Sequence, residues 1–113
     1  MRHFMHLNPS PFEKIKNGSK TIELRLYDEK RRKVKRGDEI EFAKIDWEEK
    51  LLVKVVNIYI FDSFENLYDV LPLDKCGYTK EKLPFAKAGD MESLYGKQAQ
   101  QKWGVAGIEI EVI

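Results

Sequence analysis

The chain has 113 residues, enough for one domain that buries its own hydrophobic core. Hydrophobic residues make up 42% and charged residues 35%, which is typical of a soluble globular protein and excludes a disordered chain. The formal net charge of +1 excludes a uniformly basic nucleic-acid-binding protein, so any site for a polyanion must come from local segregation of charge.

The first elements expected are a strand and a short helix. Residues 3–7 predict a strand that ends before Pro9. Ser10 is a good N-cap residue, and Gly18 suits the left-handed conformation in which helices commonly end. We therefore expect a helix of about two turns between them.

Residues 20–27 alternate with a period of two, which predicts a strand with one apolar and one polar face. Because side chains two positions apart project to the same side of a strand, the charged residues share a face. The alternation alone favours an outer face exposed to solvent, where an ion pair contributes little to stability. The apolar face carries Ile22, Leu24 and Leu26, and the polar face carries Thr21, Glu23, Arg25 and Tyr27.

Two more strands are predicted after a highly charged loop over residues 28–36. They cover residues 39–45 and 51–61, and the second is rich in Val and Ile. Lys54 and Asn57 interrupt that apolar run, which is too short and too polar to span a bilayer. Since the N-terminus also lacks the apolar region of a secretion signal, we expect a cytoplasmic protein with no membrane partner.

The second half of the chain predicts helices and a closing strand. Ser63 is expected to cap a short helix, residues 73–88 to be irregular, and Asp90 to begin a helix that runs to about Trp103. Residues 105–113 alternate cleanly again. Consecutive strands with inserted helices argue against a parallel doubly wound sheet. They favour one α+β domain over residues 1–113, a mostly antiparallel β-barrel with inserted short helices.

Residues 18–25 read Gly-Ser-Lys-Thr-Ile-Glu-Leu-Arg, and residues 37–42 read Gly-Asp-Glu-Ile-Glu-Phe. Together with the leading helix and the closing strand, these motifs make nearly the whole chain resemble the ASCH domain family of the PUA-like superfamily. The resemblance implies a PUA-like barrel, and members of the family are proposed to bind RNA. It also implies that Lys20, Glu23 and Arg25 line a cleft between the first helix and the barrel, with Thr21 beside them.

An enzymatic alternative comes from the same resemblance. One branch with this fold hydrolyses the amide of N4-acetylcytidine with a Thr nucleophile three residues after the Lys. Here Glu23 occupies that position, and a carboxylate cannot replace a hydroxyl in the same mechanism. Lys20 and Glu23 remain the candidate catalytic residues of a small amidohydrolase, with Lys20 polarising a carbonyl. The sequence does not distinguish this catalyst from a receptor.

The strongest local excess of charge is a basic segment within residues 30–36. It is expected either to contact phosphates or to be a solvated loop. Base stacking requires an exposed aromatic residue, for which Tyr27 is the first candidate and Trp47 the second. Trp103, at a helix end, is expected in the core. The six cations of the basic segment are Lys30, Arg31, Arg32, Lys33, Lys35 and Arg36.

The remaining candidates are weaker. Cys76 is the only cysteine and is expected as a small buried hydrophobe. His3 and His6 face opposite sides of a strand, so we expect no metal site and no cofactor. The apolar residues within 72–87, such as Tyr78 and Phe85, either dock a protein partner or fold over the cleft. The sequence leaves both alternatives open.

Overall fold

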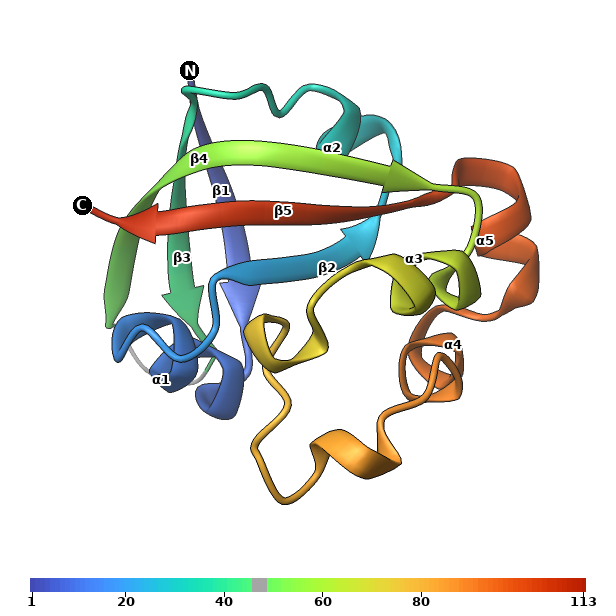
Figure 1. Ribbon diagram of the computed structural model, residues 1–113. Helices are drawn as coiled ribbons and strands as arrows, with labels where there is room; N and C mark the ends of the chain where they lie inside the picture. Colours follow the sequence, from blue (N-terminus) through green and yellow to red (C-terminus); the bar gives the residue numbers. More distant parts are fainter. Residues whose placement is uncertain (46–48) are drawn as a thin grey trace.

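Five strands form one curled sheet in the computed structural model, which describes residues 1–45 and 49–113 (Figure 1). The sheet order is β1-β3-β4-β5-β2, so β1 and β2 are its two edges. The β1–β3 pair is parallel and the other three pairs are antiparallel. This half-barrel confirms the predicted α+β, mostly antiparallel architecture. The strands are β1 (Arg2–Leu7), β2 (Ile22–Leu26), β3 (Glu39–Lys44), β4 (Lys50–Phe61) and β5 (Val105–Val112).

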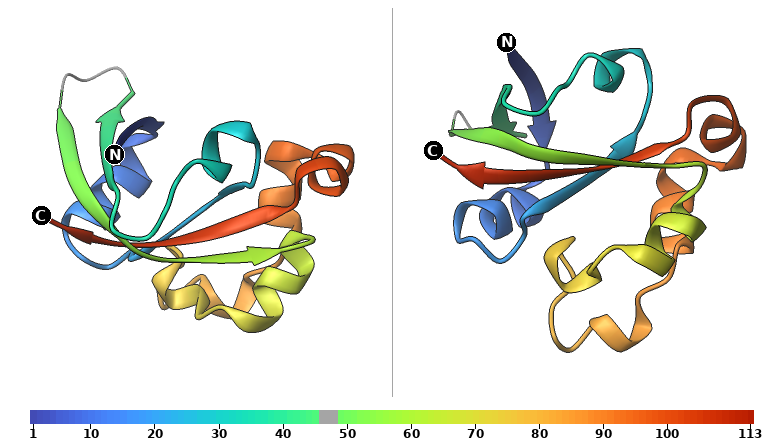
Figure 2. Two further views of the ribbon diagram at one scale, coloured as in Figure 1. Left: turned by 90° about the horizontal axis from the view of Figure 1, so that it is seen from above. Right: turned by 45° about the horizontal axis from the view of Figure 1, so that its top comes forward.

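Short helices occupy both sides of this sheet. Figure 2 shows the sheet curling around α1 and α2, while α3 and the segment that follows it lie on the other side. Each of the described helices is too short or too polar to cross a membrane. The helices are α1 (Pro9–Lys16), α2 (Glu29–Arg32), α3 (Phe64–Val70), the 3-10 turns η1 (Leu73–Lys75) and η2 (Leu83–Phe85), α4 (Gly89–Tyr95) and α5 (Lys97–Trp103).

Three local predictions differ from the structure. The helix expected from Asp90 to Trp103 is two helices, because Gly96 adopts a φ of 78° that ends α4. The expected loop 28–36 contains α2, because the Asp28 carboxylate accepts a hydrogen bond from the backbone N–H of Arg31. The first helix begins two residues earlier than expected, after Asn8.

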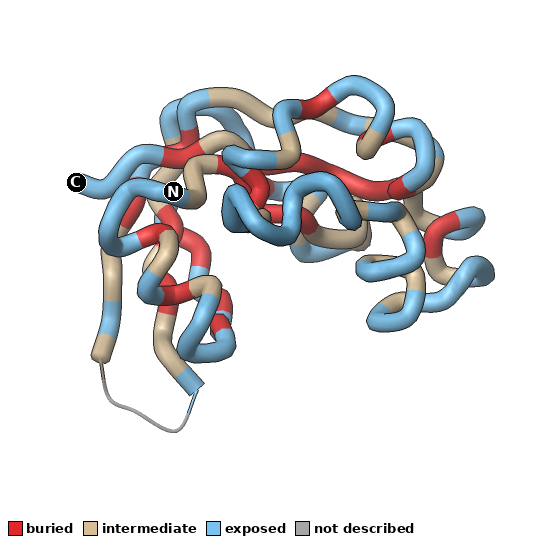
Figure 3. Tube along the Cα trace, turned by 60° about the horizontal axis from the view of Figure 1, so that its bottom comes forward, coloured by how far each residue is buried: buried red, intermediate tan, exposed pale blue. Residues whose placement is uncertain are grey.

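The sheet separates two hydrophobic cores. The inner core lies within the half-barrel against α1, and the outer core lies between β2, β5 and α3. Figure 3 shows the buried positions concentrated along the strands. Phe12 and Phe42 are completely buried in the inner core and Phe64 in the outer one. Trp103, expected in the core, is only half-buried.

Candidate ligand-binding cavity

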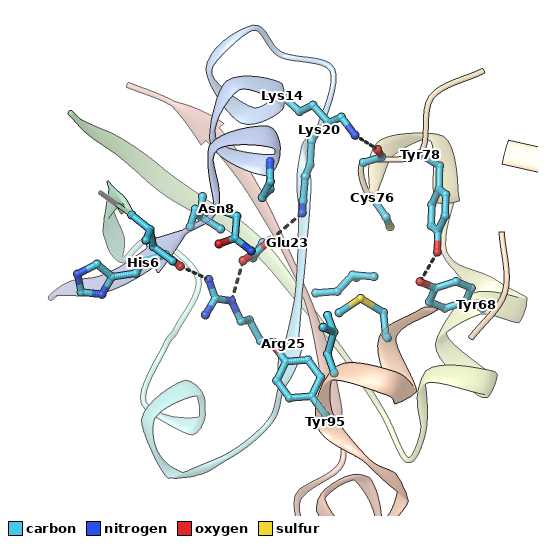
Figure 4. Close-up of a pocket in the computed structure, with 17 residues that line it drawn as sticks. His6, Asn8, Lys14, Lys20, Glu23, Arg25, Tyr68, Cys76, Tyr78 and Tyr95 are labelled. Atoms are coloured by element: carbon cyan, nitrogen blue, oxygen red, sulfur yellow. Dashed lines mark hydrogen bonds and ion pairs between the residues drawn. The ribbon is translucent and has the colours of Figure 1, made fainter. Parts of the chain in front are cut away.

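A cavity of about 350 Å³ lies where the end of β1, α1 and β2 meet the segment between α3 and α4 (Figure 4). Its size is at the lower end of the range found for small-molecule sites. Its polar walls come from one part of the chain and its aromatic walls from another. The lining residues that the following paragraphs use are His6, Lys14, Lys20, Glu23, Arg25, Tyr68, Cys76, Gly77, Tyr78, Met91 and Tyr95.

The alternation of β2 places Glu23 at the centre of the polar wall. Its neighbours Ile22 and Leu24 pack in the outer core, so Glu23 points to the opposite side of the strand. Glu23 is only 3% exposed, and cations flank both of its oxygens. Lys20 Nζ lies 2.8 Å from Oε1, and Arg25 Nε lies 2.7 Å from Oε2. The structure therefore brings together the three residues that the sequence singled out, in a buried cluster and not on a solvated face.

The two cations decide the protonation state of Glu23. Burial raises the pKa of this carboxyl, but the charges of Lys20 and Arg25 and their hydrogen bonds outweigh burial and hold the pKa below its usual range. Glu23 is thus an ionised acceptor at neutral pH. A carboxylate offers about four lone-pair sites, so each oxygen can accept one further N–H donor.

Two further contacts tie the polar wall to its surroundings. Arg25 Nη2 donates to the backbone carbonyl of His6 at 2.8 Å, which links the two edge strands. Lys14 Nζ donates to the backbone carbonyl of Gly77 at 2.8 Å. The described residues that line the cavity include three cations, Lys14, Lys20 and Arg25, against the one carboxylate of Glu23, so this part of the wall carries a net positive charge.

The aromatic wall consists of Tyr68, Tyr78 and Tyr95, with Met91 beside them. The hydroxyls of Tyr68 and Tyr78 are 2.7 Å apart, and Tyr78 donates to Asp90 at 2.7 Å. Burial is the largest cause that raises the pKa of each of these tyrosines, so all three are neutral. The sequence identified only Tyr78 of this wall, in a segment expected either to dock a protein partner or to fold over the cleft. Cys76, Gly77 and Tyr78 line the cavity.

Cys76 lies in the same wall as a buried thiol. It is 6% exposed, and burial raises its pKa to about 11. A thiol with that pKa is not a nucleophile at neutral pH. This agrees with the predicted role of Cys76 as a small buried hydrophobe.

Two other residues predicted for the site lie outside the cavity. Thr21 lines a separate hollow beside the end of α1, and its backbone N–H donates to the carbonyl of Lys75. Tyr27 packs against the inner core, with the guanidinium of Arg32 4.5 Å from its ring centroid. Trp47, the second stacking candidate, falls outside the described residues.

The six cations of the basic segment fall into two groups, because the side chains of two of them bond to other groups of the protein. Arg31 pairs with Asp28 at 3.1 Å, and Arg32 donates to the backbone carbonyl of Trp103 at 2.9 Å. The other four cations are exposed: Lys30, Lys33, Lys35 and Arg36. Among the residues that the structure describes, no group of His, Cys, Asp and Glu side chains has the arrangement of a metal site.

The ASCH domain family model matches residues 5–113. The crystal structure of hypothetical protein PH0355 shares 36% identity with a TM-score of 0.82, and each chain covers 100% of the other. The solution structure of PF0455 from Pyrococcus furiosus shares 34% identity with a TM-score of 0.76, over 100% of this chain and 98% of that one.

A more distant structure has the same fold. The ASCH domain from Lactobacillus crispatus JV V101 shares 10% identity with a TM-score of 0.62, over 97% of this chain and 79% of that one. The comparison with curated proteins found no match. The curled mixed sheet and the family model agree with the PUA-like fold expected from the motifs, and the chain belongs to the ASCH domain family.

Proposed function

We propose that the cavity binds one nucleotide unit, either free or as part of an RNA chain. The observation that carries this proposal is the buried, ionised Glu23 held between Lys20 and Arg25 in an open cavity. A fixed carboxylate accepts hydrogen bonds from N–H groups on a base edge, as Asp and Glu do from the amino group of cytosine. The ion pairs keep this acceptor charged and in one orientation.

The other groups of the cavity suit the rest of a nucleotide. Tyr68, Tyr95 and Met91 offer apolar surface to the faces of an unstacked base, which is how proteins hold single bases of RNA. Lys14 and Lys20 retain N–H donors beyond those already used, and a phosphate is the anion that such a wall accepts.

If the nucleotide belongs to a longer chain, the exposed cations of the basic segment are the proposed phosphate contacts. Lys30, Lys33, Lys35 and Arg36 are exposed, whereas Arg31 and Arg32 are held by contacts within the protein. Binding to a longer RNA is then expected to weaken as salt rises, because each phosphate contact releases counterions.

The chemistry of the cavity favours binding over amide hydrolysis. Glu23 stands where the related hydrolases have a threonine, and its lowered pKa makes it a poor base. Cys76, the other candidate nucleophile in the wall, is held as a thiol. Among the described residues that line this cavity, neither Glu23 nor Cys76 is therefore suited to be the nucleophile of an amidohydrolase.

The test is a chemical-shift titration of the ¹⁵N-labelled protein with the four ribonucleoside monophosphates. We expect shifts at Lys20, Glu23 and Arg25 that saturate, and weaker shifts with the matching nucleosides, which lack the phosphate. Lys14→Gln, in the wall of the cavity, is expected to weaken binding about tenfold by removing one charged contact. Lys80→Gln, an exposed lysine outside the cavity, is the matched control.

The absence of saturable shifts at these residues with every nucleotide would contradict the proposal. Incubation with N4-acetylcytidine tests the alternative, because release of acetate that is lost in Lys20→Ala would assign the hydrolase instead.

A further inference from the structure

Trp103 lies outside the cavity, between two shallow hollows at the junction of α2 and α5. One hollow is lined by Tyr27, Arg32 and Lys102, among others, and the second by Lys30 and Lys33. Trp103 contributes to both. None of these residues lines the cavity described above.

Arg32 fixes this junction. Its guanidinium donates to the carbonyl of Trp103, 71 residues away in the sequence, and stacks 4.5 Å from the ring centroid of Tyr27. The backbone N–H of Tyr27 donates to the carbonyl of Gly104 at 3.0 Å. These contacts hold α2 beside the end of α5, so cations from two distant segments frame one indole ring.

Three lysines frame that ring. Lys102 Nζ lies 4.8 Å from the ring centroid, and Lys30 and Lys33 project from exposed positions on and next to α2. Within residues 1–45 and 49–113, none of these lysines pairs with a carboxylate.

The acidic residues of the two hollows only partly offset this charge. Asp28 is engaged by Arg31, which leaves Glu29 in one hollow and Asp62 in the other. Lys35 and Arg36 extend the exposed positive charge beyond α2. The surface therefore keeps an excess of cations.

We infer that Trp103, Lys30, Lys33 and Lys102, here named the Trp103 surface, bind single-stranded RNA. A partly exposed aromatic ring among unpaired cations matches the stacking and backbone contacts by which proteins hold single strands. A base stacks on the indole and displaces Lys102, whose cation–π contact is weak at an exposed site, so that Lys102 contacts a phosphate. An acidic protein would use the lysines but leave the ring without a role. Lys30 and Lys33 are phosphate contacts in both proposals, but stacking on Trp103 goes beyond the function proposed for the cavity and does not depend on it.

The experiment follows the fluorescence of Trp103 in a Trp47→Phe background, where it is the only tryptophan. Titration with a single-stranded ten-nucleotide RNA is expected to quench this fluorescence. In the same titration followed by anisotropy of a labelled RNA, Trp103→Ala is expected to weaken binding roughly 5- to 150-fold, the range that loss of one base stack produces. Trp103→Phe, which keeps an aromatic ring and the packing of α5, is expected to weaken it less.

Variants that change only exposed charges test the same surface without altering the packing of Trp103. Lys30→Glu with Lys33→Glu is expected to weaken binding at least tenfold and to lower the slope of log K against log salt by about 1.4 for two lost phosphate contacts. Lys80→Glu with Lys82→Glu makes the same change in net charge at exposed positions of the irregular segment, and we expect a much smaller effect.

Several outcomes would overturn the inference. They are unchanged fluorescence on adding RNA, equal effects of the two charge variants, and equal quenching by duplex RNA or by polyglutamate. Mononucleotide titrations of the same variants test the cavity separately. If mononucleotides do not bind the cavity but RNA still quenches Trp103, the proposed function is wrong and this inference stands. If mononucleotides bind the cavity but RNA does not quench Trp103, this inference is wrong and the proposed function stands.

Discussion

Arg25 on β2 donates a hydrogen bond to the backbone carbonyl of His6 on β1, across the gap between the two edges of the half-barrel. The same guanidinium holds Glu23 through Nε at 2.7 Å. One side chain thus links the edges of the sheet and orients the acceptor of the cavity. A planar fork with donors in fixed directions makes both contacts at once, whereas an ammonium group does not.

Arg25→Lys is therefore expected to destabilise the protein although it keeps the charge. Loss of the bond to His6 should lower the free energy of unfolding by about 1.5–3 kcal/mol, the range for hydrogen bonds of charged groups. Urea unfolding measures this change. Arg36→Lys, at an exposed position, is the control and should change the free energy by less than about 0.5 kcal/mol. Equal stabilities of the two variants would show that the bridge contributes nothing.

Glu23→Gln removes the carboxylate that lies between Lys20 and Arg25 and leaves two cations without this partner. Breaking a buried ion pair from one side typically costs about 3–5 kcal/mol. We expect a loss of about 3 kcal/mol, since the amide still accepts one hydrogen bond. Glu81→Gln, at an exposed position, should have almost no effect in the same thermal or urea unfolding experiment. A loss below about 1 kcal/mol for Glu23→Gln would mean that solvent screens this cluster.

The sequence predicted the polar side of this site well and the aromatic side poorly. Alternation in β2 placed Glu23 and Arg25 on one face, and the family motif added Lys20; all three meet in the structure. Alternation does not report burial, so the same pattern favoured a solvated face. The burial comes from α1 and the end of β1, and from residues of the segment 68–95, which line the same cavity from far along the chain.

The aromatic wall could not be predicted because its placement depends on irregular structure. Tyr68 and Tyr78 come together through a hydrogen bond between a helix and a loop, and neither has a periodic signal. The break at Gly96, which separates α4 from α5, turns the second part of the expected helix away. A single glycine within a helical pattern is often tolerated, so the pattern alone did not predict this break.

Gly77→Ala is expected to affect both stability and binding. Gly77 has a φ of 110°, and an added Cβ would lie 3.2 Å from Lys20 Cδ. The strained backbone should cost about 1–2 kcal/mol, and the close contact should shift the Lys20 side chain by a few tenths of an ångström. We therefore expect weaker nucleotide shifts in the cavity than in the unmodified protein.

Gly37→Ala provides the matched control for this prediction. Gly37 has a φ of 92° with open space around the missing Cβ, so it tests backbone strain without a contact to the cavity. Urea unfolding should show similar losses for the two variants, and nucleotide titration should separate them. Equal binding by both would contradict a role for Gly77 in holding Lys20.

The lowered pKa of Asp38 predicts how the free energy of unfolding changes in acid. Hydrogen bonding to His3, with smaller contributions from Lys35 and the N-terminus and against the effect of burial, lowers the pKa of Asp38 from 3.8 to about 2. Because the folded state binds this proton more weakly than the unfolded state, the contribution is fully present above about pH 4. It is lost as the pH falls from about 4 to about 2, and amounts to about 2 kcal/mol at most.

Asp38→Asn should remove this part of the acid dependence. Urea unfolding at several pH values between 2 and 7 should give a flatter profile below pH 4 for the variant, together with a lower free energy of unfolding at pH 7. Asp69→Asn, at an exposed position on α3, is the control that should leave the profile unchanged. Parallel profiles for Asp38→Asn and the unmodified protein would show that other carboxyls dominate acid unfolding.

The reactivity of the Cys76 thiol measures how well the wall of the cavity shields it from solvent. With its pKa raised to about 11, only about 0.1% of the native thiol is ionised at pH 8, against roughly a quarter of an unperturbed one. Its reaction with an aromatic disulfide reagent should therefore be much slower in the native protein than in urea, because the thiol is buried and few thiolates are present. A bound nucleotide should slow it further, because Cys76 lines the cavity. As the only cysteine, it gives an unambiguous signal. A native rate within about tenfold of the unfolded rate would mean that the wall opens often enough to expose the thiol.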